Sequence, residues 1–262
     1  IWFNKSMQFI HYCYSLLLLI QILLLSSGVH PNPGPPRQNK YCDLSICHAN
    51  VRSLKVRNKR GILEKFEYIK CNLSKKYDII TVSETWLNDT FSSDNIILNG
   101  YQEPFRLDRH NMETTVGYGG VLAWVSSNIA CKRRQDFEIP LLEAMWLEVR
   151  TNNNKFFLCV TYRRPNIQDY WELLQSSLDI VREIEGAKIL ITGDLNADPN
   201  TPEGHKLLEF TVTNGLVKHI DQPTRILLNS QTILDQFISN FPQMIKSTDV
   251  VTPVGTSDHC VK

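Results

Sequence analysis

A succession of short apolar runs from Tyr41 onward constrains the fold more than any other feature of this 262-residue chain. Apolar residues recur at helical spacing over 62–73 and 170–184. Several of the remaining runs follow one another with no helical segment between them, which favours an α/β or α+β sandwich over a doubly wound parallel sheet. The strand candidates are Leu44–Asn50, Asp78–Ser83, Gly120–Val125, Ala144–Val149, Phe156–Tyr162, Lys188–Thr192, Leu234–Ser239 and Thr248–Thr252.

The composition excludes several classes of protein. Apolar residues make up 42% of the chain and charged residues 21%, as in an ordinary globular protein. The net charge of +1 gives no overall field that would hold a nucleic acid, so such a contact must come from local basic clusters. Seven scattered cysteines without a Cys-x-x-Cys pair indicate neither a zinc site nor a disulfide framework. The basic clusters are Arg52/Lys55/Arg57/Lys59/Arg60, Lys132/Arg133/Arg134 and Arg163/Arg164.

Residues 1–40 are interpreted as an apolar leader and a Pro-rich linker, and residues 41–262 as one domain. Ile10–Leu25 is mostly apolar but is shorter than the roughly 20 residues that a membrane span needs. Three interpretations stay open for the leader: a secretory signal, a plain linker, and a relic of the ribosome-skipping peptides of picornaviral type, which 28–35 (GVHPNPGP) partly resembles. The domain is expected to be truncated at its C-terminus, because the chain stops just after a polar motif at 257–259.

Polar side chains gather at the ends of the predicted strands. Gly193-Asp194-Leu195-Asn196 follows an apolar run, and the alternation of strand side chains points its carboxylate and its carboxamide to the same side. Ser257-Asp258-His259 adds an oxygen ligand beside an imidazole that titrates near neutral pH. Together these motifs predict a site that hydrolyses a phosphodiester. Other polar strand ends are His48–Leu54 (HANVRSL), Ser83–Leu87 (SETWL), Tyr162–Pro165 (YRRP) and Asp235.

These motifs, taken in order, resemble the endonuclease/exonuclease/phosphatase superfamily, and within it the apurinic-type endonucleases of non-LTR retrotransposons. The Asn-x-x-Ser-Leu, Ser-Glu-Thr-Trp-Leu, Tyr-Arg-x-Pro, Gly-Asp-x-Asn and Ser-Asp-His blocks match over about 210 residues. The resemblance implies a deoxyribonuclease I-like fold, in which helices flank a two-sheet β-sandwich.

The resemblance also implies a role for each polar residue. Mg²⁺, with Mn²⁺ as the alternative, would bind Glu84, with Asn50 and Asp258 near it; oxygen ligands of this kind suit magnesium. Asp194 would activate or orient the attacking water, and Asn196 and Tyr162 would hold the phosphate. His259, aligned by Asp235, would donate to a non-bridging oxygen as charge develops. Arg163 and Ser257 are expected to bind the substrate, Arg163 as a clamp on its backbone.

The implied activity is DNA nicking that leaves a 3′-hydroxyl, from which a reverse transcriptase domain beyond Lys262 would copy the element RNA. Two alternatives remain. One is a phosphoinositide phosphatase or sphingomyelinase-type phosphodiesterase of the same fold, and the other is an inactive remnant that only binds nucleic acid. The resemblance implies action in the nucleus after synthesis in the cytoplasm, while the leader leaves a secretory or membrane location open. The polar loops expected to set target choice are Asn88–Asn99, Arg106–Val116 and Gln222–Gln231.

Overall fold

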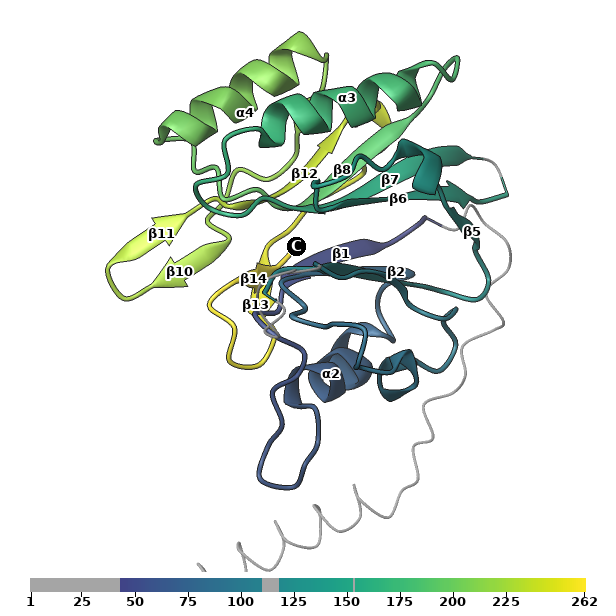
Figure 1. Ribbon diagram of the computed structural model, residues 1–262, viewed down its shortest axis with the longest axis vertical. Helices are drawn as coiled ribbons and strands as arrows, with labels where there is room; N and C mark the ends of the chain where they lie inside the picture. Colours follow the sequence, from purple (N-terminus) through teal and green to yellow (C-terminus); the bar gives the residue numbers. More distant parts are fainter. Residues whose placement is uncertain (1–42, 110–117, 153) are drawn as a thin grey trace, which may run out of the picture. The chain divides into compact units, whose positions relative to one another are not determined.

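Two β-sheets stack face to face in the part of the chain that the computed structural model describes, residues 43–109, 118–152 and 154–262 (Figure 1). Helices lie on the outer faces of both sheets, which confirms the predicted mixed α/β sandwich. Residues 1–42 lie outside the described residues, so the leader and the linker stay predictions. None of the helices in the described segments combines the length and the apolar character that crossing a lipid bilayer requires.

The first sheet has four strands in the order β1-β2-β4-β3. β1 runs parallel to β2, while β4 pairs antiparallel with both β2 and β3. β2 and β4 are buried along their whole length, which explains their near-continuous runs of apolar and β-branched residues. The strands are β1 (Ile46–Asn50), β2 (Ile79–Ser83), β3 (Phe105–Leu107) and β4 (Val121–Val125).

The second sheet has six strands in the order β5-β6-β7-β8-β12-β9. β7 and β8 are parallel, and their register places Tyr162 beside Asp194. β8 and β12 are antiparallel, and Asp194 lies opposite Asp235. The order of the strands thus brings three polar strand ends of the sequence together. The strands are β5 (Ala130–Arg133), β6 (Ala144–Arg150), β7 (Lys155–Tyr162), β8 (Ile189–Asp194), β9 (Val217–Lys218) and β12 (Asp235–Ser239).

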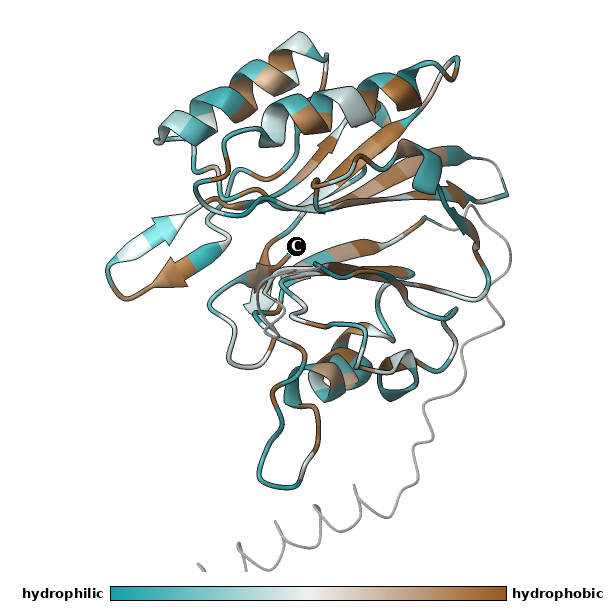
Figure 2. Ribbon diagram, in the orientation of Figure 1, coloured by the Kyte–Doolittle hydropathy of each residue, from teal (hydrophilic) through white to brown (hydrophobic). Residues whose placement is uncertain are grey.

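Three apolar layers hold the fold together. One fills the space between the sheets, where side chains of β4 such as Ala123 meet side chains of β6 and β7 such as Leu147 and Leu158. A second lies between the first sheet and the helical segment α2 (Glu64–Tyr68) with its π-helical continuation η1 (Ile69–Leu73), and a third lies under α3 and α4. Figure 2 shows this pattern as brown strands and helices that are teal on their outer faces.

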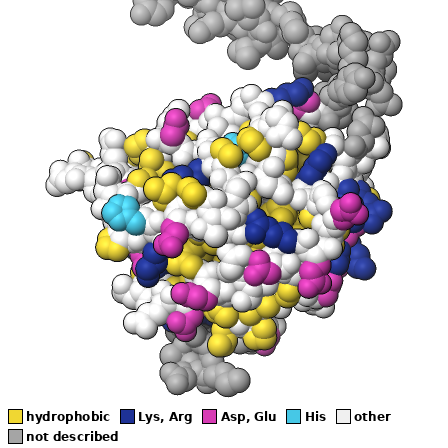
Figure 3. Space-filling view, turned by 90° about the horizontal axis from the view of Figure 1, so that it is seen from above, with side chains coloured by type: hydrophobic (Ala, Val, Ile, Leu, Met, Phe, Trp, Pro, Cys, Tyr) yellow, Lys and Arg dark blue, Asp and Glu magenta, His cyan; other side chains and the backbone are white. Residues whose placement is uncertain are grey.

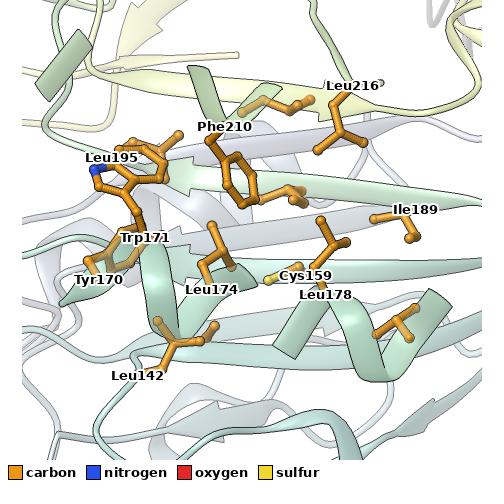
Figure 4. Close-up of a cluster of buried hydrophobic side chains, with 14 of the residues drawn as sticks. Leu142, Cys159, Tyr170, Trp171, Leu174, Leu178, Ile189, Leu195, Phe210 and Leu216 are labelled. Atoms are coloured by element: carbon orange, nitrogen blue, oxygen red, sulfur yellow. The ribbon is translucent and has the colours of Figure 1, made fainter. Parts of the chain in front are cut away.

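Helices α3 (Tyr170–Arg182) and α4 (Pro202–Thr213) cover the outer face of the second sheet (Figure 1). The apolar residues of α3 recur at helical spacing, so one face of the helix, including Leu174 and Leu178, packs onto the strands (Figure 4). α4 was not predicted, although Thr201 accepts a hydrogen bond from Gly204 N at 3.1 Å and caps its start. Seen from above, this helical face carries scattered apolar side chains among charged ones (Figure 3).

The last third of the chain adds short elements around the second sheet. The predicted loop Gln222–Gln231 lies mostly in a hairpin that projects from the body of the protein, and the strand predicted at Thr248–Thr252 begins only at Val251. Lys262 exchanges two main-chain hydrogen bonds of 3.1 Å with His48, so the end of the chain lies beside β1. The remaining elements are β10 (Arg225–Leu227), β11 (Ser230–Thr232), β13 (Val251–Pro253), β14 (Cys260–Val261), η2 (Ser93–Ile96), η3 (Gln135–Phe137) and η4 (Pro242–Met244).

Candidate active site

A buried carboxylate–histidine pair forms the centre of the site. Asp235, the first residue of β12, is fully buried, and its Oδ2 lies 2.9 Å from Nδ1 of His259. Ser257 holds the turn that carries the histidine: its hydroxyl accepts a hydrogen bond from His259 N at 3.2 Å and donates to the carbonyl of Asn50 at 2.7 Å. Elements from both sheets therefore fix the imidazole in place.

Asp194 lies next to this pair at the end of β8. Its Oδ2 is 3.9 Å from His259 Nδ1 and accepts a hydrogen bond of 2.7 Å from Asn50 Nδ2, while its Oδ1 accepts one of 2.9 Å from the main chain of Asn196. Burial, followed by the negative charge of Asp235, raises the pKa of Asp194 to about 6. A carboxylate with such a pKa is suited to accept a proton near neutral pH.

The charges around His259 favour its protonated form. Burial alone would lower the pKa of His259, but the charge and the hydrogen bond of Asp235 raise it. Burial alone would raise the pKa of Asp235, but the cations of Lys262 and His259 hold it well below its usual range. The result is an imidazolium between two carboxylates, with Asp235 ionised.

Asp194, Asp235 and His259 each bring one potential metal-ligand atom within 4.8 Å of the others. This group differs from the metal site predicted from the sequence. His259 Nδ1 is already engaged by Asp235, and a protonated imidazole has no lone pair to offer a metal. We therefore assign this group to proton transfer. The predicted set of Glu84, Asn50 and Asp258 remains the better candidate for a metal site.

That second group begins with Glu84, which follows β2. Its Oε1 accepts a hydrogen bond of 2.8 Å from Asn50 Nδ2, and its Oε2 accepts one of 3.1 Å from the indole of Trp86. Both Glu84 and Trp86 have positive φ angles, 53° and 55°, which are strained for residues with side chains. Trp86 is half-buried, and its ring packs edge-on against that of Tyr118.

Asp258 completes the predicted metal group but is bound by cations of the protein. Burial alone would raise the pKa of Asp258, but its Oδ2 accepts a hydrogen bond of 2.8 Å from Arg225 Nε, and this bond together with the charges of His259 and Arg225 lowers that pKa. Its Oδ1 is buried without a hydrogen-bond partner and lies 3.7 Å from the Arg52 guanidinium. Asp258 and Glu84 both act electrostatically on Lys65, whose Nζ donates to the Val51 and Arg52 carbonyls.

Tyr162, at the end of β7, is nearly buried, and its ring lies 5.6 Å from the guanidinium carbon of Arg109. Burial, together with the negative charges of Glu84 and Asp194, raises the pKa of Tyr162. The phenol therefore stays protonated near neutral pH and can donate a hydrogen bond to an anion. Arg109 in turn pairs with Glu143, which also accepts a hydrogen bond of 2.7 Å from Gly120 N.

The expectation that Arg163 clamps the substrate backbone is wrong. Its side chain is 2% exposed and forms an ion pair with Glu203 at the start of α4. The same guanidinium donates to the carbonyl of Asn196 at 3.2 Å, and Asn196 Nδ2 donates back to the Arg163 carbonyl at 2.8 Å. Asn196 has a φ of 46°, so Arg163 stabilises a turn that few residues adopt unaided. Arg163 is thus a positioning residue for the Asp194–Asn196 turn.

The expectation that Ser257 binds substrate is wrong for a similar reason. Its side chain is buried, its single O–H donates to the carbonyl of Asn50, and its oxygen accepts from His259 N. Ser257 positions these two residues instead of contacting a ligand.

Two buried residues beside Asp235 were not predicted. Lys262 Nζ lies 2.8 Å from Asp235 Oδ2, and His48 Nε2 lies 3.8 Å from Asp235 Oδ1. Burial lowers the pKa of His48 to about 3, so its ring is neutral at pH 7. His48 was predictable, because strand alternation puts it on the same side of β1 as Asn50. No comparable pattern in the sequence marks Lys262.

The comparisons with known proteins agree with this geometry. A sequence profile of the endonuclease/exonuclease/phosphatase family matches residues 47–259. The chain belongs to this family. Members of the family are hydrolytic enzymes, and some are metal-dependent nucleases. No curated protein matches the chain in sequence.

Solved structures of the family share this fold. The endonuclease domain of TRAS1, a telomere-specific non-LTR retrotransposon, is 16% identical with a TM-score of 0.60, over 83% of this chain and 95% of that domain. The AP endonuclease LMAP from Leishmania major is 15% identical with a TM-score of 0.61, over 83% and 86% of the two chains. The 3′ phosphatase NExo from Neisseria, bound to a product DNA hairpin, is 15% identical with a TM-score of 0.59, over 83% and 97%.

Proposed function

We propose that this protein is a divalent-metal-dependent phosphodiesterase that nicks DNA. The observation that carries the proposal is the Asp235–His259 pair at 2.9 Å, with Asp194 beside it. One group in this cluster can accept a proton near neutral pH and another can donate a hydrogen bond to a phosphate oxygen. A hydrolase that adds water across a phosphodiester needs both.

The roles of the side chains follow from their protonation. Asp194 accepts a proton from the attacking water as the water oxygen bonds to phosphorus and the bond from phosphorus to the 3′-oxygen breaks. His259, held in its protonated form by Asp235, donates to a non-bridging oxygen on which negative charge builds up. Asn196 and the protonated Tyr162 hold the phosphate in line. The products are a 3′-hydroxyl, which takes its proton from solvent, and a 5′-phosphate.

The chain's own residues fit a divalent cation at Glu84, Asn50 and Asp258. Glu84 and Asp258 offer carboxylate oxygens, as magnesium prefers. Asn50 Oδ1 accepts a hydrogen bond of 3.0 Å from Arg52 N and keeps its second lone pair for a ligand. The buried Asp258 Oδ1 accepts no hydrogen bond, which supports a ligand role for that atom. When bound, such an ion supplies positive charge that neutralises the phosphate and stabilises the leaving oxygen. Mn²⁺ would suit the same donors.

The choice of DNA as substrate rests on the likeness to structures that include a retrotransposon endonuclease domain and a phosphatase bound to a DNA hairpin. In the fuller form of the proposal, the nick occurs in the nucleus and its 3′-hydroxyl primes copying of an element RNA by a reverse transcriptase domain of the same product. The reading frame beyond Lys262 tests that fuller form directly.

The activity is tested with supercoiled plasmid, Mg²⁺ and residues 41–262 or the full chain. We expect conversion to the open-circular form, loss of the activity in EDTA, and extension of the nick by a DNA polymerase, which needs a 3′-hydroxyl. Glu84→Gln should raise the Mg²⁺ concentration needed for half-maximal activity. Phosphate release from a phosphoinositide or phosphocholine release from sphingomyelin, with an intact plasmid, would replace the proposal by the lipid alternative. Duplex binding without any hydrolysis would indicate a remnant that only binds nucleic acid.

A further inference from the structure

A run of basic residues links β1 to α2 without any compensating acid. The sequence contains no Asp or Glu between Asp43 and Glu64, yet it places Lys55, Arg57, Lys59 and Arg60 there. We refer to residues 55–60 as the basic turn. The side chains of Arg57, Lys59 and Arg60 are exposed, and that of Lys55 is partly so.

Charge compensation elsewhere in the molecule makes this turn unusual. Among the described residues, no carboxylate lies within 4.0 Å of a cation of the basic turn; the Arg57 guanidinium donates to the carbonyl of Gly61 at 2.5 Å. Most other arginines of the described chain are neutralised by a nearby carboxylate. Examples are Arg106–Asp108 at 2.5 Å, Arg133–Glu138 at 2.7 Å, Arg134–Glu148 at 2.8 Å and Arg225–Asp258 at 2.8 Å.

The basic turn has a defined backbone conformation. Asn58 Oδ1 accepts hydrogen bonds from Arg60 N at 2.9 Å and from Ile62 N at 3.1 Å, and Asn58 N donates to the Ile62 carbonyl at 2.9 Å. Gly61 supplies the positive φ of 75° that closes the turn. The cations are therefore presented by an ordered backbone, which lowers the conformational entropy that a ligand must overcome.

The basic turn begins at the edge of the active site. Asn50, which contacts both Glu84 and Asp194, is followed two residues later by Arg52, whose side chain is 60% exposed and faces Asp258. In Figure 1 the turn projects from the edge at which β14 lies, and the β10–β11 hairpin projects on the other side of that edge. A long ligand that crosses the site would meet the turn on one flank.

We infer that the basic turn binds the phosphate backbone of duplex DNA on one flank of the scissile bond. The inference rests on the proposed function and adds where the substrate lies on this protein. A net charge of +1 cannot attract DNA through a general field, so the attraction must come from uncompensated cations near the site. The turn supplies sequence-independent affinity and does not touch the reacting atoms.

The test compares two charge-matched variants of the full chain. The first carries Arg57→Gln, Lys59→Gln and Arg60→Gln. The control carries Lys75→Gln, Lys76→Gln and Lys132→Gln, which remove three exposed cations next to the start of β2 and on β5, away from the site edge. Binding of a fluorescent duplex is measured by anisotropy at several salt concentrations, and initial rates of plasmid nicking are measured over a range of DNA concentrations that reaches saturation.

We expect the first variant to lower the magnitude of the slope of log K against log salt by about 2 to 3, because each lost phosphate contact changes it by about 0.9. The Kd at 0.1 M salt should rise about tenfold or more. KM for nicking should rise with it, while kcat and the thermal midpoint stay at their wild-type values. The control should keep the wild-type slope.

Either an unchanged slope in the first variant or an equal loss in the control would overturn the inference. A wild-type protein that binds duplex through the basic turn but does not nick would remove the proposed function and leave the binding surface. A protein that nicks plasmid, but whose slope of log K against log salt is unchanged by the basic-turn substitutions, would keep the proposed function and remove the binding surface.

Discussion

Arg163 and Asn196 exchange hydrogen bonds: the guanidinium of Arg163 donates to the Asn196 carbonyl at 3.2 Å, and Asn196 Nδ2 donates to the Arg163 carbonyl at 2.8 Å. Arg163 N also donates to the carbonyl of Asp194 at 2.9 Å. Because Glu203 on α4 anchors the guanidinium, a helix outside the site determines the shape of the turn that carries Asp194.

Replacing Arg163 with methionine should therefore slow catalysis without removing any group that contacts substrate. A shift of the catalytic turn by an ångström typically costs about 100-fold in rate, so we expect kcat for nicking to fall by about that factor with a smaller change in KM. Arg163→Lys keeps the charge but not the planar fork and should recover only part of the rate.

The neighbouring Arg164→Met serves as the control for Arg163, because its side chain is exposed. Hydrogen exchange adds a readout that is independent of activity: in Arg163→Met the amide of Asn196 should exchange faster, while amides of β6 keep their protection. Wild-type kcat in Arg163→Met would contradict the positioning role.

The Asp235–His259 pair should be essential for rate but not for the fold. His259→Ala removes the donor to the phosphate and should lower kcat by about 100-fold or more, within the range typical of acid–base groups. Asp235→Asn removes the charge that keeps His259 protonated and should give a similar loss. Plasmid nicking measures the rate, and near-UV circular dichroism checks the fold. A well-folded variant that nicks at the wild-type rate would refute the assigned role.

Activity should follow a bell-shaped dependence on pH. The pKa of Asp194 is raised to about 6, so below that pH the carboxyl is protonated and cannot accept a proton from water. The pKa of His259 is raised above its ordinary 6.5, so the basic limb should fall off only above that value. Initial rates from pH 4.5 to about 9 test both limbs. A rate that keeps rising as pH falls below 5 would contradict the assignment of Asp194.

The layer beneath α3 should contribute more to stability than the exposed face of α4. Leu178 is fully buried against the second sheet (Figure 4), and Leu178→Ala should lower the free energy of unfolding by about 2 to 5 kcal/mol. Leu208 on α4 is 50% exposed, and Leu208→Ala should cost less than about 1 kcal/mol. Urea denaturation of the two variants measures the difference, and equal losses would contradict this packing.

The strands of the sandwich were predictable because their signal is local. Phe156–Tyr162 lies within β7, and Lys188–Thr192 overlaps β8. The register of these two strands places the polar residues at their ends, Tyr162 and Asp194, side by side. The pairing of Asp235 with His259 was also expected, because a carboxylate inside an apolar run needs a partner.

The features that could not be predicted depend on contacts between residues that are far apart in the sequence. The burial of Arg163 depends on Glu203, and α4 was overlooked even though Thr201 and Pro202 are typical of a helix start. For Ser257, the decisive contact is the carbonyl of Asn50, which no side-chain pattern reveals. The predicted roles were thus wrong where a buried polar side chain forms its hydrogen bonds or ion pairs with other residues of the protein.

The hydrogen bond from Ser257 to Asn50 also affects how the protein acquires its activity with time. It joins residues 207 positions apart, and the bond from Asn50 to Asp194 joins residues 144 apart. Contacts that close such long loops form late, because loop closure costs conformational entropy before the contacts stabilise the chain. During refolding, helical and strand signals should therefore return before nicking does. The recovery of enzymatic activity would then report when the two sheets have docked.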